Sequence, residues 1–109
     1  MPRADDKLLE GNLDTVLLSI LAAEPSYGYQ IVTEAERRTE GRLRVRENAL
    51  YPALHRMERQ GLLSGEWRTE GVRRRRYYRL TKQGGQELKR RRARWREFAD
   101  TMSAALGEG

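Results

Sequence analysis

The sequence predicts a mainly helical fold with one small β-hairpin, and two observations support this. Apolar residues recur at helical spacing in four separate stretches of the 109-residue chain. Between the third and the fourth stretch the period changes to two, around a short turn that contains glycine. A chain of this length is expected to form one compact unit with a modest core.

The first predicted helix covers residues 12–23, NLDTVLLSILAA, with Asn12 as its capping residue. After a break, Ser26 is expected to cap a second helix that ends near Gly41. Gly28 lies inside this second helix, where glycine costs about 1 kcal/mol relative to alanine. We therefore expect another backbone, of a helix or of a phosphate chain, to approach closely at Gly28.

A third helix is predicted after the alternating segment RLRVR, residues 42–46, which is short enough for a small strand. The helix lies in ENALYPALHRMERQGLL and ends at Gly61, which fits a left-handed stop. One face is apolar. The opposite face carries Asn48, Pro52, His55, Arg56 and Arg59, with Tyr51 on its flank.

The hairpin is predicted over residues 62–80, where LLSGEWRT and RRRRYYRL flank the turn EGV. Tyr78 and Leu80 are expected to face the domain. Trp67 is expected to pack the hairpin onto the domain. The four arginines at residues 73–76 then form a basic surface toward the tip.

A last helix, capped by Thr81, is predicted from Lys82 to about Leu106, with an apolar stripe that includes residues seven apart. A helix this long does not bury its whole stripe on a small domain, so the spacing favours packing on a partner. A helix folded back on its own core is the alternative. The predicted dimerisation residues are Leu9, Leu88, Trp95, Phe98, Met102 and Leu106.

The charge is unevenly distributed along the chain. Residues 73–96 carry 12 basic side chains against one acid, a net charge of +11, whereas the whole chain has a net charge of +6. This asymmetry indicates a polyanionic partner, although a solvated basic helix would look the same.

Several classes of function are disfavoured. The chain has no cysteine, and its single histidine, His55, makes a poor metal site or catalytic triad. We find no glycine-rich phosphate loop, so no enzyme and no cofactor are predicted. There is no long apolar run or signal region, so we expect a cytoplasmic protein without a membrane.

The order of elements is that of a winged helix-turn-helix domain, residues 1–81, followed by a dimerisation helix, residues 82–109. The third helix would enter the major groove of double-stranded DNA, and the hairpin would contact the backbone or the minor groove. Two other interpretations stand beside this one: a winged-helix protein-docking adaptor and an RNA-binding protein. The candidate DNA-binding residues are Asn48, Tyr51, His55, Arg56, Arg59, Arg73, Arg74, Arg75 and Arg76.

SYGYQI, ENALYPALHRMERQGLL and GVRRRRYYRLTKQG together resemble the PadR family of bacterial transcriptional regulators, in its short subgroup. The resemblance covers roughly residues 9–98. It implies a homodimer that binds an inverted-repeat operator, usually as a repressor. It also implies a small aromatic or drug-like effector, which in some members lies at the dimer centre against a tryptophan, here Trp95.

The chain departs from the family pattern at the start of the third helix. Arg46 stands where the family usually has Ser or Asn, and Ala49 stands where Thr is common. An arginine cannot accept the capping hydrogen bond, which costs about 1 kcal/mol, and Glu47 offsets part of this through the helix dipole. The family's operator preference therefore does not transfer to this chain.

Overall fold

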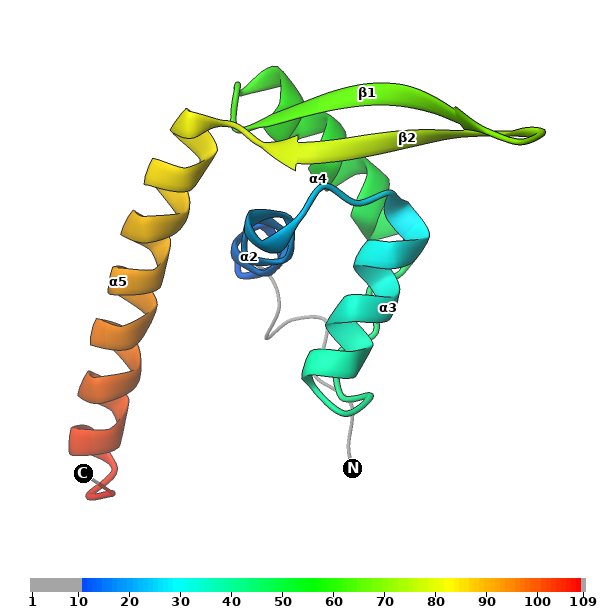
Figure 1. The fold of residues 1–109 in the computed structure, drawn as a ribbon. Helices are drawn as coiled ribbons and strands as arrows, with labels where there is room; N and C mark the ends of the chain where they lie inside the picture. Colours follow the sequence, from blue (N-terminus) through cyan, green and yellow to red (C-terminus); the bar gives the residue numbers. More distant parts are fainter. Residues whose placement is uncertain (1–10, 109) are drawn as a thin grey trace.

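The computed structural model describes residues 11–108, which form four helices and one antiparallel hairpin (Figure 1). The mainly helical fold with a small hairpin is as predicted, and its element order is that of a winged helix-turn-helix. No helix in this part of the chain is long and apolar enough to cross a lipid bilayer. The elements are α2 (Leu13–Ala23), α3 (Gly28–Arg38), α4 (Glu47–Arg59), β1 (Leu63–Glu70), β2 (Arg73–Leu80) and α5 (Lys82–Ala105).

Helix α2 is the centre of the core and lies between α3 and α5 (Figure 1). Its buried side chains include Leu17 and Leu18. They pack with Ile31 of α3 and with Leu54 and Met57 of α4. Full burial of such a side chain contributes roughly 1.5–3 kcal/mol, so this cluster holds the domain together.

The start of α3 differs from the prediction. Tyr27, not Ser26, occupies the N-cap position, and its backbone N–H donates to the side-chain oxygen of Gln30 at 3.1 Å. Ser26 instead pairs with Tyr78 of β2 through two backbone hydrogen bonds of 3.0 and 2.9 Å. The prediction failed because Ser26 lies one residue too early and is used as a short strand partner.

Gly28 makes a close approach, but not to a backbone. A Cβ atom at Gly28 would lie 2.9 Å from Cζ of Tyr51, so the phenol ring of α4 fills that space. The predicted contact with the backbone of a neighbouring helix is therefore wrong, and the absence of a side chain at Gly28 serves the packing of Tyr51.

Residues 42–46 do not form a strand. Leu43 and Val45 are buried and the three arginines between and beside them are exposed, so the alternation is real. The segment is extended but has no strand partner among residues 11–108. It leads directly into α4, where Arg46 occupies the N-cap without a side-chain cap.

Helix α4 ends as predicted. Gly61 has a φ of 81°, the left-handed conformation that favours glycine. The backbone N–H of Leu62 then donates to the carbonyl of Met57 at 3.0 Å, which closes the helix. The chain turns at once into β1, so the hairpin begins beside the end of α4.

The hairpin is regular, with Leu63 opposite Leu80 and Glu70 opposite Arg73. Tyr78 is 1% exposed and anchors β2 to the core, as predicted. Trp67 does not pack onto the domain, because it is 52% exposed. The far half of the hairpin projects beyond the helices (Figure 1), so a residue midway along β1 has no core to contact.

Helix α5 begins at the predicted cap, where the Thr81 hydroxyl accepts a hydrogen bond from the N–H of Gly84 at 3.0 Å. Leu88 is buried against the core. Beyond it the helix runs past the domain (Figure 1), and its large apolar side chains are exposed. The alternative in which α5 folds back onto its own core therefore fails for the second half of the helix.

Candidate nucleic-acid interface

The outer face of α4 is open to solvent. Asn48, His55 and Arg59 are exposed, and Tyr51 is 39% exposed. The rings of Tyr51 and His55 lie near each other, with centroids 6.4 Å apart. Because Leu54 and its apolar neighbours hold the other face of α4 in the core, this polar face is presented outward.

Arg56 lies on α4 but its guanidinium is engaged within the protein. It donates to both carboxylate oxygens of Asp14 on α2, one of them at 2.9 Å. Two parallel bonds of this kind fix the orientation of an arginine. The structure therefore places Arg56 apart from Asn48, His55 and Arg59, whose side chains make no hydrogen bond or ion pair with any residue in the described range.

The tip of the hairpin carries two arginines that are available to a ligand. The side chain of Arg73 is exposed and has no hydrogen-bond or ion-pair partner among residues 11–108. Arg74 stacks over the ring of Trp67 at 4.6 Å from the ring centroid. An arginine held flat on an aromatic ring keeps its donors directed outward.

Arg75 and Tyr77 belong to a small cluster on the opposite face of the hairpin. The Arg75 guanidinium lies 4.5 Å from the ring centroid of Tyr27 and 3.2 Å from a carboxylate oxygen of Glu70. The Tyr77 hydroxyl donates to Glu70 at 2.8 Å. The Tyr77 hydroxyl and Arg75 lower the pKa of the Glu70 carboxyl, and the same carboxylate raises the pKa of Tyr77.

Arg76 anchors the hairpin to α4. It donates to Glu58 at 2.7 Å, and the same carboxylate oxygen accepts the backbone N–H of Gly65 at 3.2 Å. A Cβ at Gly65 would lie 2.7 Å from an Arg76 nitrogen, so the glycine makes room for the guanidinium. Arg76 therefore has a structural role that the run of four arginines did not reveal.

Asp14 and Glu58 are the residues that sequence reasoning missed. Both are acidic side chains that bind arginines of the predicted interface, and neither lies on an apolar stripe. Their only signal in the sequence is their acidic charge, which does not identify a distant partner.

The predicted dimerisation residues fall into three groups. Leu88 is buried within the domain, and Leu9 lies outside the described residues. The others form an exposed stripe along the second half of α5, where the Trp95 and Phe98 rings lie 6.0 Å apart. The exposed fractions in this stripe are 55% for Trp95, 59% for Phe98, 41% for Met102 and 63% for Leu106.

A helix-turn-helix with an open polar helix face, beside a hairpin with a basic tip, defines the winged-helix class of DNA-binding regulators. The model of the "Transcriptional regulator PadR-like family" matches residues 17–90. The chain belongs to this family. It is therefore a transcriptional regulator and not an enzyme.

Solved structures and a curated relative are also similar to the chain. The chain resembles a transcriptional regulator from Clostridium thermocellum, with a TM-score of 0.84 and 30% identity over 90% of this chain and 96% of that one. A PadR family transcriptional regulator from Eggerthella lenta has a TM-score of 0.82 and 35% identity, over 94% of this chain and 88% of that one. The uncharacterized protein X of Lysinibacillus sphaericus is 30% identical, over 94% of this chain and 93% of its own length.

Proposed function

We propose that the protein is a homodimeric repressor that binds an inverted-repeat operator and is released by a small aromatic effector. The observation that carries the proposal is the exposed face of α4 beside the arginines at the hairpin tip. In this arrangement α4 enters the major groove, where side-chain amide, imidazole and guanidinium groups read base edges. The hairpin tip neutralises phosphates, which adds affinity without sequence preference.

We assign the DNA contacts to the residues that have no strong partner within the chain. Arg56 and Arg76 are excluded, because each is ion-paired to a carboxylate, and Arg75 is held by Glu70 and Tyr27. The proposed contacts are Asn48, Tyr51, His55 and Arg59 of α4 and Arg73 and Arg74 of the hairpin.

The exposed stripe of α5 supports the homodimer. Four large apolar side chains on one helix face are unusual for a monomer in water, and a second copy offers the same stripe in return. The neighbouring rings of Trp95 and Phe98 form an aromatic surface that suits a flat ligand between two such helices. A ligand there would change the distance between the two α4 helices, a coupling worth roughly 1–3 kcal/mol.

The first test is selection of duplex DNA from a random library by the purified protein at near-physiological salt. Enrichment of an inverted repeat, with half-sites about one helical turn apart, is the expected result. Recovery of DNA without any enriched sequence would contradict the proposed binding to a specific operator. No recovery, even at low salt, would favour a protein-docking adaptor.

The second test asks whether the arginines at the hairpin tip contribute more to DNA affinity than exposed basic residues elsewhere on the surface do. We expect Arg73→Ala with Arg74→Ala to weaken binding to all sequences and to flatten the logarithmic salt dependence by about 0.9 for each phosphate that the hairpin no longer neutralises. Lys89→Ala with Arg96→Ala is the matched control, since it removes the same charge from the exposed surface of α5. Equal losses of affinity in the two variants would contradict the role of the hairpin.

A further inference from the structure

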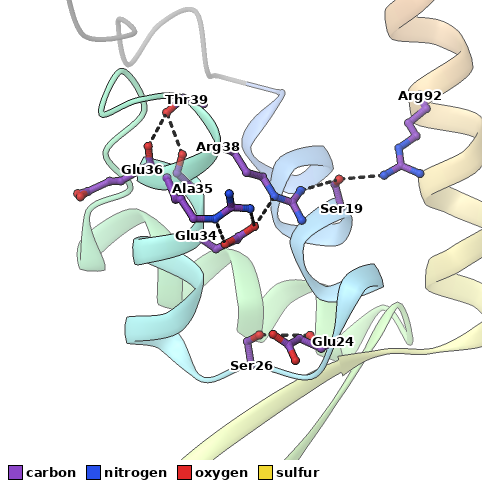
Figure 2. A network of polar contacts seen from close by, with 10 residues as sticks. Ser19, Glu24, Ser26, Glu34, Ala35, Glu36, Arg38, Thr39 and Arg92 are labelled. Atoms are coloured by element: carbon purple, nitrogen blue, oxygen red, sulfur yellow. Dashed lines mark hydrogen bonds and ion pairs between the residues drawn. The ribbon is translucent and has the colours of Figure 1, made fainter.

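Two side chains of α2 each contact one arginine of the helix-turn-helix and one arginine of α5. Asp14 binds Arg56 of α4 at 2.9 Å and also lies 3.6 Å from Arg91 of α5. Five residues further along α2, the hydroxyl of Ser19 accepts from Arg38 of α3 at 3.2 Å and from Arg92 of α5 at 2.9 Å. Figure 2 shows Ser19 between these two arginines, which reach it from opposite sides.

The Asp14 site is partly enclosed. The side chain of Asp14 is 15% exposed and that of Arg91 is 22% exposed. Arg91 is further fixed by Glu87 at 2.6 Å. Ion pairs that are partly removed from solvent are screened less by salt than exposed pairs are, and they hold a defined geometry.

These polar contacts differ from the apolar contacts in that they depend on the angle between α5 and α2. Leu88 packs α5 onto the core, but apolar burial is non-directional and tolerates a change in the angle between two helices. Hydrogen bonds to arginine depend on direction as well as distance. The hydrogen bond from Arg92 to Ser19 therefore constrains how α5 is inclined to α2, and the ion pair between Arg91 and Asp14 adds an attraction one turn away. Arg56 and Arg38 connect the same two side chains of α2 to the helices of the helix-turn-helix.

We propose that Asp14 and Ser19 are positioning residues that fix the angle between α5 and the reading helix α4, and so set the half-site spacing that the dimer accepts. The part of this proposal that concerns DNA rests on the function proposed above. From Arg91 to Met102 the helix extends about 16 Å, so a tilt of about 10° moves the dimer contact by about 3 Å. One base-pair step is about 3.4 Å, so a tilt of this size changes the preferred spacing.

The first experiment measures the angle without DNA. The chain has no cysteine, so spin labels can be attached at Glu47→Cys in α4 and Glu97→Cys in α5, both at exposed positions. Labelled protein is diluted with unlabelled protein, so that pulsed dipolar spectroscopy reports the distance within one chain. Glu97 lies about 9 Å along α5 from Arg91, so we expect Asp14→Asn with Ser19→Ala to shift or broaden this distance by about 1.5 Å.

The matched control is Glu36→Gln, which removes the exposed Glu36–Arg44 ion pair, a contact that involves neither α2 nor α5. Its distance distribution should equal that of the parent. An unchanged distribution in the Asp14 and Ser19 variant would overturn the proposal. Should that variant not fold, Arg91→Gln with Arg92→Gln removes the same contacts from α5 and leaves the Asp14–Arg56 pair intact, and the same criterion applies.

The second experiment uses DNA with two copies of the selected half-site and a variable spacer. We expect the parent to prefer one spacer length, and the Asp14 and Ser19 variant to accept neighbouring lengths with the half-site sequence unchanged. A sharp and unaltered spacer preference in the variant would refute the link to spacing. If the parent itself binds no duplex, the proposed function fails, whereas the distance measurement still decides whether the two side chains fix the angle.

Discussion

Two neighbouring glycines lie in the first turn of α5, and we expect their substitution by alanine to change the stability of the fold in opposite directions. A Cβ at Gly84 would lie 2.8 Å from Cδ1 of Leu80 and 3.0 Å from the carbonyl carbon of Leu62, whereas the nearest atom to a Cβ at Gly85 would be 3.9 Å away. We expect Gly84→Ala to lower the free energy of unfolding by about 1–3 kcal/mol, because backbone cannot move aside easily. Gly85→Ala should raise it by up to about 1 kcal/mol through helix propensity. Urea denaturation compares the two, and effects of the same sign would contradict the contact of α5 with Leu62.

The pKa of Glu34 gives a prediction for acid pH. Hydrogen bonds from Arg37 and Arg38 lower the pKa of this carboxyl to about 2 from the ordinary value of 4.5. Because the folded state binds this proton less readily, the ion pairs stabilise the fold fully above about pH 4.5 and are lost as the pH falls toward 2. An NMR titration of the Glu34 carboxyl should therefore have its midpoint near pH 2 in the folded protein.

The control for this titration removes both donors. In the variant Arg37→Gln with Arg38→Gln, the Glu34 midpoint should return toward 4.5, while Glu70, which has other partners, should keep its lowered pKa. A parent midpoint near 4.5 would mean that the two arginines do not hold this carboxylate in solution.

At the scale of elements, the helices and the hairpin follow from periodicity because each has an apolar face and a recognisable end. Thr81 and Gly61 mark the boundaries of α5 and α4 through their own backbone chemistry. The segment 42–46 was mispredicted as a strand because alternation only shows that Leu43 and Val45 face the core. A strand also needs a partner backbone, and the sequence of one segment does not contain that information.

The candidate site was predicted less completely than the fold. Helical phase and strand alternation show in which direction a Cβ points, so they placed Asn48 and His55 on an open face. They do not show where a long side chain ends. Arg56 and Arg76 reach acids that are 42 and 18 residues away in the sequence, and such pairs become visible only when the elements are packed.

The start of α4 carries the next prediction. Arg46 occupies the N-cap in an extended conformation, with φ −85° and ψ 149°, but offers no acceptor to the first turn. Arg46→Ser supplies that acceptor and should raise the free energy of unfolding by about 0.5–2 kcal/mol. Arg46→Ala is the matched control, because it removes the same exposed arginine without supplying an acceptor at the N-cap. Thermal denaturation compares the two variants, and equal melting temperatures would contradict the cap assignment.

At the scale of the whole molecule, the two ends of the fold carry different surfaces. The hairpin and the outer face of α4 are basic and polar, whereas the far half of α5 is apolar along one stripe, and α2 connects them (Figure 1). In the proposed homodimer, association and DNA binding would therefore depend on different residues. A substitution in the α5 stripe should therefore change the oligomeric state and leave the fold of the winged helix intact.

Phe98→Glu tests this separation. It places a charge in the centre of the exposed stripe, and in a symmetric dimer two such charges would be buried without partners. We expect dimer dissociation to become at least about a hundredfold more favourable, which corresponds to about 2.7 kcal/mol, as measured by sedimentation equilibrium. Circular dichroism should retain the helical signal, since the buried core includes Leu88 but none of the residues of the exposed stripe.

The matched control introduces the same charge on the other side of the helix. Ala93 is exposed and lies about half a turn around α5 from Trp95, so Ala93→Glu should leave the dimer unchanged. Affinity for the full inverted repeat should fall in Phe98→Glu, because a monomer contacts one half-site, whereas affinity for an isolated half-site should stay the same. A Phe98→Glu protein that sediments as the parent does would contradict the stripe as the dimer contact. Equal dissociation in Ala93→Glu would mean that added charge, and not the apolar face, controls association.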